Sequence, residues 1–440
     1  MRNTDIEANS NSKSDIGLAK VVFAAAAGTL IEWYDFFVFG ALAKSLSSQF
    51  YKTGTADGDM IIWLGAFAAG FITRPIGSLI FGYLGDVVGR KYTFTLTLLL
   101  MGGCTFMVGC LPTYAQIGPA AGYLLITLRL IQGLAIGGEY GGAIIFIAEH
   151  APVKHRGFYT GFLQITASLA MLMSIFVIWL CRMAVGTTKF LQWGWRIPFL
   201  ISVILVLVSM YIRVTLEESP EFEKVKEDGM SKNPLLETFS SPRNLYLVLV
   251  ALFGANMGSG AVFYVAEFYS LTFLQNNAHV PEMDAYMIAG TALLVGTPFV
   301  ILFGHLSDIW GRKSLILSGM ALSVAFWYPI YYGMYVYGYK IDGDLNFRYS
   351  PVLLSLLMIA QIVFAAMAYG PLAAFMSELF PAKIRYTAMS LPLNIGNGII
   401  GGLVPVIGLS VAVATGDMFS ALWYPMIIAS ISVIVGYIFI

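Results

Sequence analysis

Apolar segments of about 20 residues recur along the whole chain and are separated by short polar connections. A segment of this length lets an α-helix cross the apolar part of a bilayer. Twelve such segments are predicted, and they start near residues 20, 60, 92, 119, 158, 194, 244, 284, 314, 351, 387 and 419. The pattern therefore predicts an all-α protein embedded in a membrane.

The composition supports this interpretation. Hydrophobic residues make up 58% of the chain and charged residues 11%, whereas soluble domains carry roughly 25% charged residues. The first apolar segment follows a polar tail, residues 1–19, and contains Glu32 and Asp35 in its interior. It is too long and too charged in its middle for a cleaved signal peptide, so we expect it to remain as a helix.

The Lys and Arg residues are distributed unevenly between the two sets of connections. Most of them lie in connections on the same side as the N-terminus. Because cytoplasmic loops of membrane proteins carry an excess of Lys and Arg, both termini are predicted to be cytoplasmic. The formal net charge is zero, and without a basic domain no nucleic-acid partner is expected.

Two polar turns occur twice in the chain. Residues 82–91 and 304–313 share Gly, then Asp four positions later, then Gly-Arg-Lys. Residues 149–156 and 378–385 share Glu and Arg at their ends with Pro between them. Two repeated turns with similar spacing indicate that the chain consists of two similar halves.

The repeats define the predicted domain organisation. We expect two pseudo-symmetric bundles of six transmembrane helices, residues 20–216 and residues 244–440. The longest polar stretch, residues 217–243, is the predicted cytoplasmic linker between them, and residues 1–19 are a cytoplasmic tail. Two such halves are typical of secondary transporters.

Several local motifs point to a known family. They are Ile31-Glu32-Trp33-Tyr34-Asp35-Phe36-Phe37, Arg74-Pro75-Ile76-Gly77, Arg129-Leu130-Ile131-Gln132-Gly133, Gly137-Gly138-Glu139-Tyr140-Gly141-Gly142, Trp195-Arg196-Ile197-Pro198-Phe199 and Glu218-Ser219-Pro220-Glu221-Phe222. Through them the sequence resembles the metabolite:H+ symporter family of the major facilitator superfamily, which includes shikimate, proline/betaine and 2-oxoglutarate carriers. The resemblance implies alternating access and proton-coupled symport of a small metabolite across a bacterial-type inner (plasma) membrane by a functional monomer.

Ionisable side chains inside the apolar segments are the first candidates for function, because such groups are costly in lipid and face the protein interior. The six candidates are Glu32, Asp35, Arg74, Arg129, Glu139 and Glu267. The helical rise places Asp35, with Glu32 one turn below it, at the depth of Arg129. It likewise places Arg74 at the depth of Glu139. The choice of partner helices is implied by the resemblance alone.

A carboxylate beside an arginine in a cavity can alternate between a protonated state and an ion-paired state. Asp35 or Glu32 is therefore the predicted proton carrier, with Arg129 as its partner. The alternative is that these residues form static ion pairs that fix helix packing. Arg74 and Arg129 favour a carboxylate-bearing substrate, although acidic partners can already neutralise both.

Other polar residues are candidates for lining a substrate cavity. Glu267 lies in an aromatic stretch and could bind a cationic or hydroxyl-bearing substrate, carry a proton, or face water near the outer end. Each further candidate is on its own more typical of helix packing. These candidates are Gln132, Gln164, Asn256, Tyr264, Gln361, Tyr369, Asn394 and Asn397.

The repeated turns are the predicted cytoplasmic gate. Their glycines allow tight connections, and Asp86 can accept hydrogen bonds at the start of the next helix. The resemblance implies a charge network of Asp86 and Arg90 with Glu149 and Arg156, and a matching network in the second half. The alternative is that the positive charges only anchor the topology. The gate candidates are Gly82, Asp86, Gly89, Arg90, Lys91, Glu149, Arg156, Asp308, Gly311, Arg312, Lys313, Glu378 and Arg385.

No cofactor or metal site is predicted. The three cysteines and four histidines lack metal-ligand spacing, and no phosphate-binding loop occurs. The glycine pattern at residues 396–401 lies in an apolar segment, where helix packing explains it better than dinucleotide binding. The leading interpretation is therefore a proton-coupled symporter with a small-molecule substrate. A uniporter or antiporter is the main alternative, and a non-transporting sensor or a membrane enzyme is less favoured.

Overall fold

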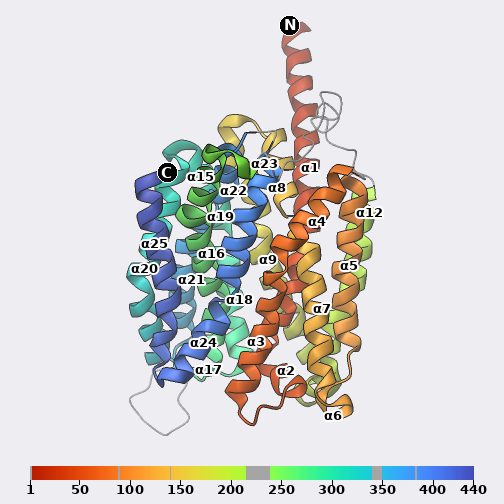
Figure 1. The fold of residues 1–440 in the computed structure, drawn as a ribbon, viewed down its shortest axis with the longest axis vertical. Coiled ribbons are helices and arrows are strands. Elements are labelled where there is room, and N and C mark those ends of the chain that lie inside the picture. Colours follow the sequence, from red (N-terminus) through yellow and green to blue (C-terminus); the bar gives the residue numbers. More distant parts are fainter. Residues whose placement is uncertain (1, 88–89, 139, 215–237, 339–348, 382–383) are drawn as a thin grey trace.

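The computed structural model describes residues 2–87, 90–138, 140–214, 238–338, 349–381 and 384–440 (Figure 1). Within these ranges the chain forms helices and no strands. This agrees with the predicted all-α class, because only a helix satisfies its own backbone hydrogen bonds inside lipid without forming a closed barrel.

The first half of the chain, residues 2–214, ends before the predicted linker. Its elements are α1 (Arg2–Ala41), α2 (Ala43–Phe50), α3 (Ala56–Ile72), α4 (Arg74–Val87), α5 (Arg90–Cys110), α6 (Tyr114–Ile117), α7 (Ala120–Gly137), α8 (Tyr140–His150), η1 (Val153–His155), α9 (Arg156–Val185), α10 (Thr187–Lys189), η2 (Phe190–Gly194), α11 (Arg196–Leu200) and α12 (Ser202–Val214).

The second half, residues 238–440, is likewise a series of helices, and among the described residues it contains more irregular helical turns than the first half. Its elements are α15 (Pro242–Ala251), η3 (Leu252–Asn256), α16 (Met257–Tyr264), η4 (Val265–Tyr269), α17 (Ser270–Asn276), α18 (Glu282–Gly296), α19 (Pro298–Trp310), α20 (Arg312–Val336), α21 (Pro351–Tyr369), α22 (Leu372–Leu379), α23 (Arg385–Leu393), η5 (Asn394–Gly401), α24 (Val404–Thr415), η6 (Met418–Leu422) and α25 (Trp423–Phe439).

Most predicted segments coincide with a helix or with consecutive helices. For example, the segments predicted to start near residues 119, 284 and 351 begin in the structure at Ala120, Glu282 and Pro351. Among the described residues, nine helical segments are long and apolar enough to cross a membrane, and a bent pair, Thr187–Gly194 with Arg196–Val208, would be a tenth. The predicted polar tail is the helical beginning of α1, which projects beyond the bundle (Figure 1).

The two halves lie side by side, and both termini are at the same end of the molecule (Figure 1). We call this the terminal end, and we call the opposite end, where α2, α6 and α17 lie, the far end. Between the halves, α9 packs against α18 and α19, while α3 and α4 pack against α23, η5 and α24. The contact surface between the halves therefore runs from one end to the other.

Two glycines face each other at a close contact between the halves. A Cβ atom on Gly157 of α9 would lie 2.2 Å from the carbonyl oxygen of Gly304 in α19. A Cβ atom on Gly304 would lie 2.5 Å from the carbonyl oxygen of Gly157. Any larger side chain at either position would hold the helices apart, so glycine sets the distance between the halves here.

Glycines also bring α4 and α7 together within the first half. A Cβ atom on Gly77 would lie 2.0 Å from the Leu134 carbonyl oxygen, and one on Gly137 would lie 2.0 Å from the Arg74 carbonyl oxygen. Small residues allow such close approach in membranes, where dispersion contacts rather than hydrophobic burial drive association. This packing fixes the backbone of Arg74 against α7.

Three π-helical turns lie at predicted site residues in the described part of the second half, and the first of them, η3, ends at Asn256. Glu267 lies in η4, and both Asn394 and Asn397 lie in η5. Such turns are rare and frequently occur at functional sites, because they redirect side chains and free backbone groups. The glycine pattern at residues 396–401 is part of η5, and a Cβ atom on Gly396 would lie 2.7 Å from Asn256 Cβ.

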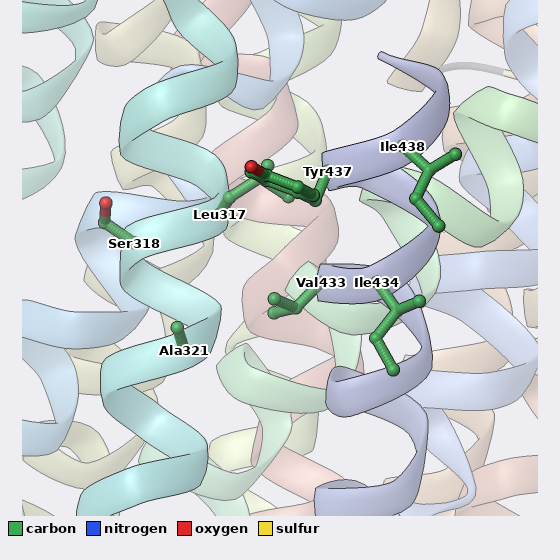
Figure 2. Close-up of a pocket in the computed structure, with 7 residues that line it drawn as sticks. All are labelled: Leu317, Ser318, Ala321, Val433, Ile434, Tyr437 and Ile438. Atoms are coloured by element: carbon green, nitrogen blue, oxygen red, sulfur yellow. The ribbon is translucent and has the colours of Figure 1, made fainter.

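A groove between α20 and α25 has an almost wholly apolar lining (Figure 2). Ser318 and the Tyr437 hydroxyl are its polar contributions. Such a lining suits contact with lipid chains, since the bilayer interior offers no water to polar groups. The residues that line the groove are Leu317, Ser318, Ala321, Val433, Ile434, Tyr437 and Ile438.

Candidate functional site

The charged side chains that the sequence places inside apolar segments are buried in the protein. Glu32, Asp35, Arg74, Arg129 and Glu267 are each at most 4% exposed. Because burying an unpaired charge is costly, their partners decide what each can do. The sixth candidate, Glu139, lies outside the described residues.

Arg129 is held by a chain of polar contacts rather than by a direct ion pair. Its Nη1 donates to Gln132 Oε1 at 2.7 Å, and Gln132 Nε2 donates to Thr105 Oγ1 at 2.6 Å. Asp35 interacts with both Thr105 and Arg129, yet its Oδ1 atom has no hydrogen-bond partner. The Asp35 carboxylate and the Arg129 guanidinium are therefore neighbours, and the Thr105 hydroxyl and the Gln132 amide connect them.

Aromatic rings cover the Arg129 guanidinium. Its central carbon lies 4.0 Å from the ring centre of Phe36 and 4.4 Å from that of Phe39. Cation–π contacts of this kind stabilise a desolvated arginine without neutralising its charge. The Nε and Nη2 atoms of Arg129 have no hydrogen-bond partner, so this group keeps free donors for a carboxylate.

Arg74 begins α4 and occupies a similar aromatic cage. Its central carbon lies 4.4 Å from the ring centre of Phe71 and 4.8 Å from that of Trp33. Among the described residues, Glu32 is an acidic residue that interacts with Arg74, whereas the sequence predicted Glu32 together with Arg129. Glu32 lies one helical turn from Asp35 towards the terminal end, which brings it to the beginning of α4. Arg74 Nε and Nη2 have no hydrogen-bond partner among the described residues, which do not include its predicted partner Glu139.

Glu267 of the second half forms a hydrogen bond with the first half. Its Oε1 atom accepts a hydrogen bond from the Ser168 hydroxyl of α9, while its Oε2 atom has no partner. Tyr264 and Tyr369 interact electrostatically with both Glu267 and Arg74. One buried polar cluster therefore contains an arginine from the first half and a carboxylate from the second.

A second polar link between the halves joins Tyr140, Gln164 and Tyr369. The Tyr140 hydroxyl donates to Gln164 Oε1 and lies 3.3 Å from the Tyr369 hydroxyl. Gln164 Nε2 donates to the backbone carbonyl oxygen of Tyr369 at 2.8 Å. These contacts place two predicted cavity residues, Gln164 and Tyr369, at the centre of the contact surface between the halves.

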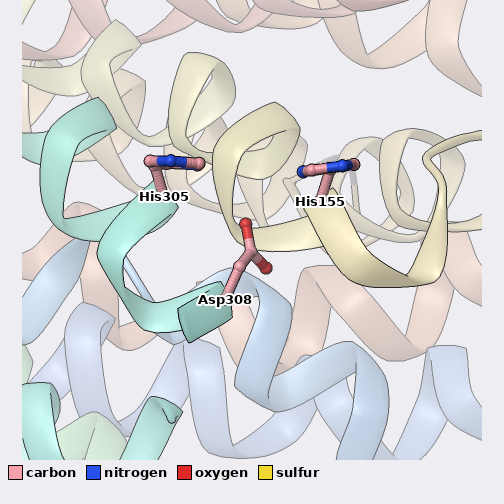
Figure 3. Close-up of side chains that lie close together, drawn as sticks. All are labelled: His155, His305 and Asp308. Atoms are coloured by element: carbon pink, nitrogen blue, oxygen red, sulfur yellow. The ribbon is translucent and has the colours of Figure 1, made fainter. Parts of the chain in front are cut away.

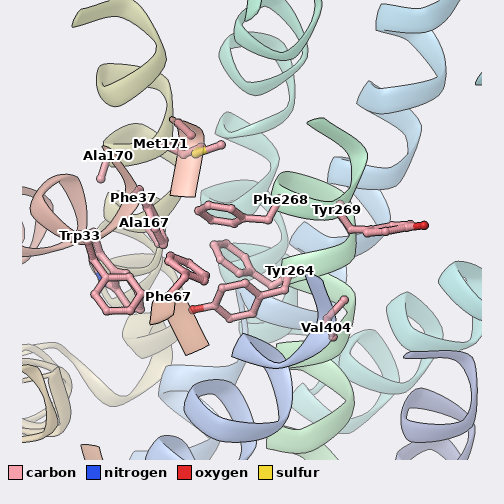
Figure 4. Packing of buried hydrophobic residues seen from close by; sticks show 14 of the residues in the cluster. Trp33, Phe37, Phe67, Ala167, Ala170, Met171, Tyr264, Phe268, Tyr269 and Val404 are labelled. Atoms are coloured by element: carbon pink, nitrogen blue, oxygen red, sulfur yellow. The ribbon is translucent and has the colours of Figure 1, made fainter. Parts of the chain in front are cut away.

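Aromatic side chains from both halves meet beside this cluster (Figure 4). Tyr264 and Phe268 point from the second half towards Phe37 and Phe67 of the first, while Tyr269 points away. The ring centres of Phe37 and Phe268 are 4.8 Å apart, and those of Phe67 and Phe268 are 5.2 Å apart. The predicted cavity residue Tyr264 thus combines an aromatic face with a hydroxyl that has no partner.

The remaining predicted cavity residues have mixed surroundings. Asn394 Nδ2 donates across the halves to the Gly137 carbonyl oxygen at 3.2 Å, and both amide atoms of Asn397 are buried without a partner. Asn256 Nδ2 donates to the Ala251 carbonyl oxygen at 2.9 Å within its own half. Gln361 Nε2 lies 3.8 Å from Met334 Sδ, also within its own half. Asn394 thus reaches the first half, whereas Asn397 lies beside Gly260 of its own half.

The polar groups at the centre of the molecule can bind a ligand or a proton. Buried polar atoms in native proteins are nearly always hydrogen-bonded, so a group of them without partners indicates where a ligand or proton binds. The arginine nitrogens can hold a carboxylate, and the free carboxylate oxygens can hold a proton or a donor group. The buried atoms of this cluster that lack a partner among the described residues are Asp35 Oδ1, Arg74 Nε and Nη2, Arg129 Nε and Nη2, Tyr264 OH and Glu267 Oε2.

At the terminal end an ion pair joins the repeated turns of opposite halves. Arg385 Nη1 lies 3.0 Å from Glu149 Oε1. Asp308 Oδ1 and Oδ2 accept hydrogen bonds from the backbone N–H groups of Gly157 and Phe158, at 2.9 and 3.0 Å. The first turn of α9 in the first half is thus capped by a carboxylate from the second half.

Other gate candidates make contacts within one half. Arg312 Nη2 lies 2.7 Å from Asp308 Oδ1 and 3.0 Å from Glu378 Oε1. Arg156 Nε donates to the Ala148 carbonyl oxygen at 3.0 Å, and Lys313 Nζ donates to the Tyr437 carbonyl oxygen at 3.0 Å. Gly311 has φ +89°, a left-handed conformation that suits glycine at the tight turn.

The first copy of the turn is described only in part. Gly82 and Asp86 lie on α4, and Arg90 and Lys91 begin α5. Gly89 lies outside the described residues. The network that the resemblance implies for Asp86 and Arg90 therefore stays a prediction.

Two histidines that are distant in sequence meet at the terminal end. Potential ligand atoms of His155, His305 and Asp308 lie within 4.8 Å of one another (Figure 3). Both Asp308 oxygens already accept backbone hydrogen bonds, and the Arg312 guanidinium is adjacent. A cation there would compete with a positive charge, so we assign no metal-binding role to this group.

Comparison with known proteins decides the family. The model of the sugar (and other) transporter family matches residues 20–229 and again residues 221–440. The chain belongs to the sugar (and other) transporter family. It is 32% identical to a proline/betaine transporter of Salmonella typhimurium, covering 95% of this chain and 83% of the relative. It is 30% identical to the shikimate transporter of Escherichia coli, covering 93% and 90%.

The fold agrees with this membership. The transporter superposes on the structure of the major facilitator superfamily proton:xylose symporter XylE with a TM-score of 0.74, at 17% identity, covering 96% of this chain and 95% of that one. The expected major facilitator fold is thereby confirmed. The protein is an integral membrane transporter and not an enzyme.

Several transporter residues at these contacts were not singled out from the sequence. Thr105 and Ser168 are each one of several hydroxyl residues in an apolar helix, where such groups usually bond to their own backbone. Arg182 and Glu282, 2.8 Å apart at the far end, have no recognisable motif. Their position near helix ends made them indistinguishable from residues at a membrane boundary.

Proposed function

We propose that the protein is a proton-coupled symporter for a small, carboxylate-bearing metabolite and works by alternating access. The observation that carries this proposal is the central cluster, where buried arginine nitrogens of the first half and carboxylate oxygens from both halves lack partners within the part of the chain that the structure describes. The two relatives described above are transporters of proline and betaine and of shikimate, and these compounds all bear a carboxyl group. Arg74 and Arg129 are the groups that would hold it.

Asp35 is the proposed proton carrier, with Glu32 as the alternative carboxylate. Asp35 is 1% exposed, touches the Arg129–Gln132–Thr105 chain and has a free oxygen. A proton on Asp35 would weaken its interaction with Arg129 and release that guanidinium towards a substrate carboxylate. Arg74 with Glu139 remains the proposed inner charge layer, and the nearness of Glu32 to Arg74 supports adding Glu32 to it.

Glu267 is the proposed second contact with the substrate. It is the acidic member of the cluster contributed by the second half, next to Tyr264 and Tyr369. Its free oxygen would accept a hydrogen bond from a hydroxyl or ammonium group. A substrate bound to Arg74 and Glu267 at once would connect the two halves.

The cross-half contacts at both ends correspond to an occluded state. Glu149–Arg385 joins the halves at the terminal end and Arg182–Glu282 joins them at the far end. Alternating access needs each set to break in turn while the other persists. Accordingly, we propose twelve membrane spans in two bundles, residues 20–216 and 244–440, with residues 217–243 as the linker.

The excess of Lys and Arg at the terminal end supports a cytoplasmic location for both termini. The bacterial relatives support a place in the inner (plasma) membrane. The complete arrangement of the site within one chain supports function as a monomer. The terminal end would then be the cytoplasmic gate, with the gate candidates of the repeated turns acting there.

Asp35→Asn in proteoliposomes tests the proposal. Uptake of the transported metabolite is measured with and without an inward proton gradient, together with exchange of internal for external metabolite. We expect the gradient-driven accumulation to disappear and the exchange to persist, because exchange needs substrate binding without net proton movement. Accumulation that survives in Asp35→Asn would refute its role, and wild-type uptake that ignores the gradient would favour a uniporter or antiporter.

A further inference from the structure

Four residues at the far end form a compact contact across the halves. We name Ser45, Arg182, Glu282 and Tyr286 the far-end clasp. Arg182 Nη2 lies 2.8 Å from Glu282 Oε1 and donates to Ser45 Oγ at 2.7 Å. The Ser45 hydroxyl in turn donates to the same Glu282 oxygen. One carboxylate oxygen of the second half thus receives two donors from the first.

Tyr286 completes this arrangement from the second half. Its hydroxyl lies 2.8 Å from the Ala41 carbonyl oxygen of the first half and 3.0 Å from Glu282 Oε1. Close by, Lys44 Nζ donates to the Gln275 carbonyl oxygen, again between the halves. The end of α1 and the beginning of α2 are thereby attached to α17 and α18.

The energetics of the clasp favour a closed far end. The Arg182 side chain is 3% exposed and stands beside the rings of Phe190 and Tyr286, so it is desolvated. Removing the partner of a buried charge leaves that charge without compensation, whereas separating the halves would return it to water. Loss of Glu282 would therefore raise the free energy of the closed far end relative to the open one.

We infer that the far-end clasp is the gate that closes the side of the transporter opposite its termini. The inference extends the alternating access proposed above, because it assigns the second gate to specific residues. The terminal-end contact Glu149–Arg385 and the far-end clasp are then opposing locks. Weakening one shifts the population towards opening at that end and away from opening at the other.

Cysteine labelling of the reconstituted full-length protein tests the inference. Native Cys104, Cys110 and Cys181 are replaced by Ser, and Met60→Cys serves as the far-end reporter. Met60 is buried, and its Sδ atom accepts a hydrogen bond from Asn276 Nδ2 of the other half at 3.2 Å. This contact lies outside the clasp. Ser390→Cys is the terminal-end reporter, since Ser390 Oγ would lie 2.7 Å from a Cβ atom on Gly141 of the other half.

Glu282→Gln keeps the shape of the side chain and removes its charge. We expect the far-end reporter to react with a membrane-impermeant maleimide on the order of tenfold faster, between the effects of exposed and buried ion pairs. The terminal-end reporter should react more slowly. Glu149→Gln, the corresponding change at the other lock, should give the opposite pair of shifts.

Asp284→Asn is the matched control. Asp284 lies two residues from Glu282 on α18 and accepts a hydrogen bond from Tyr349 of the same half at 2.8 Å. It should leave both labelling rates unchanged. An equal acceleration in Asp284→Asn, or no acceleration in a folded Glu282→Gln protein, would overturn the clasp as a gate.

A cross-linking experiment tests the same contact if the charge variants fail to fold. In Ser45→Cys/Glu282→Cys, a short reducible thiol cross-linker should stop uptake and reduction should restore it. Uptake that continues in the cross-linked protein would overturn the inference. The outcome is separable from that of the proton-coupling proposal, because labelling and cross-linking need no proton gradient: opposite shifts at the two ends would support the clasp even if uptake were independent of pH.

Discussion

Glu149 and Arg385 form an ion pair, with 3.0 Å between Oε1 and Nη1, that joins the two halves at the terminal end. Glu149 is the first residue of one repeated turn, residues 149–156, and Arg385 is the last residue of the other, residues 378–385. The acidic position of one repeat therefore contacts the basic position of the other. Because the turn is repeated, each half carries a Glu and an Arg there, and the Glu of one half can pair with the Arg of the other.

The charge swap Glu149→Arg/Arg385→Glu tests this contact. Each single change should lower uptake several-fold and increase labelling from the terminal end, because it places like charges together in the closed state. The double variant should recover part of the loss. Uptake and Ser390→Cys labelling measure the effect, and a double variant no better than the worse single variant would contradict a direct contact.

Gly304→Ala should prevent full closure at the terminal end. The added methyl carbon would lie 2.5 Å from the Gly157 carbonyl oxygen, so the halves must separate. Labelling of Ser390→Cys should accelerate and uptake should fall.

Gly290→Ala is the control, because its methyl carbon on α18 would meet Leu172 and Ile175 of α9 at ordinary contact distances of 3.8 and 4.0 Å. Equal effects of the two alanines would show that closeness of the backbones is not the cause.

Gly77→Ala should destabilise the first half. Its methyl carbon would lie 2.0 Å from the Leu134 carbonyl oxygen, and forcing a methyl group into packed structure costs about 1–3 kcal/mol. Gly65→Ala on α3 has nothing within 4 Å and should have little effect. Thermal unfolding in detergent measures the difference, and an unchanged midpoint for Gly77→Ala would refute the packing argument.

Arg74→Lys should raise the KM for the transported metabolite about tenfold, because lysine cannot stack in the cage of Trp33 and Phe71 or bind a carboxylate through two nitrogens. Arg196→Lys is the control, since Arg196 donates to the Gly109 and Leu111 carbonyl oxygens inside the first half. That change should lower stability with an unchanged KM. A KM unaffected by Arg74→Lys would remove Arg74 from the binding site.

The sequence by itself determined the class of protein and the positions of its helices. Long apolar segments can only be helices that cross lipid, because every backbone polar group there needs a partner within the helix. The same reasoning placed Asp35 and Arg129 in the interior, where both are buried, since lipid does not tolerate an exposed charge, but it left Glu267 open between the interior and the outer end. The repeated turns also indicated the two halves, each of which matches the family model.

Only the tertiary structure decided which of these groups meet. Depth along a helix is a single coordinate, whereas contact also depends on the rotation of each helix and on the crossing of its neighbours. Glu32 is therefore near Arg74, while Arg129 bonds to Gln132 and reaches Asp35 beside Thr105. Rotation about the helix axis is invisible in a segment that is apolar on every side.

The contacts between the halves were hidden for the same reason. Gly157 with Gly304, Ser168 with Glu267, and Arg182 with Glu282 each join segments that are distant in the chain. Nothing local distinguishes such a residue from one that packs within its own helix or lies at a membrane boundary. Local chemistry determined what these side chains can do, and the packing of the two halves determined which of them do it together.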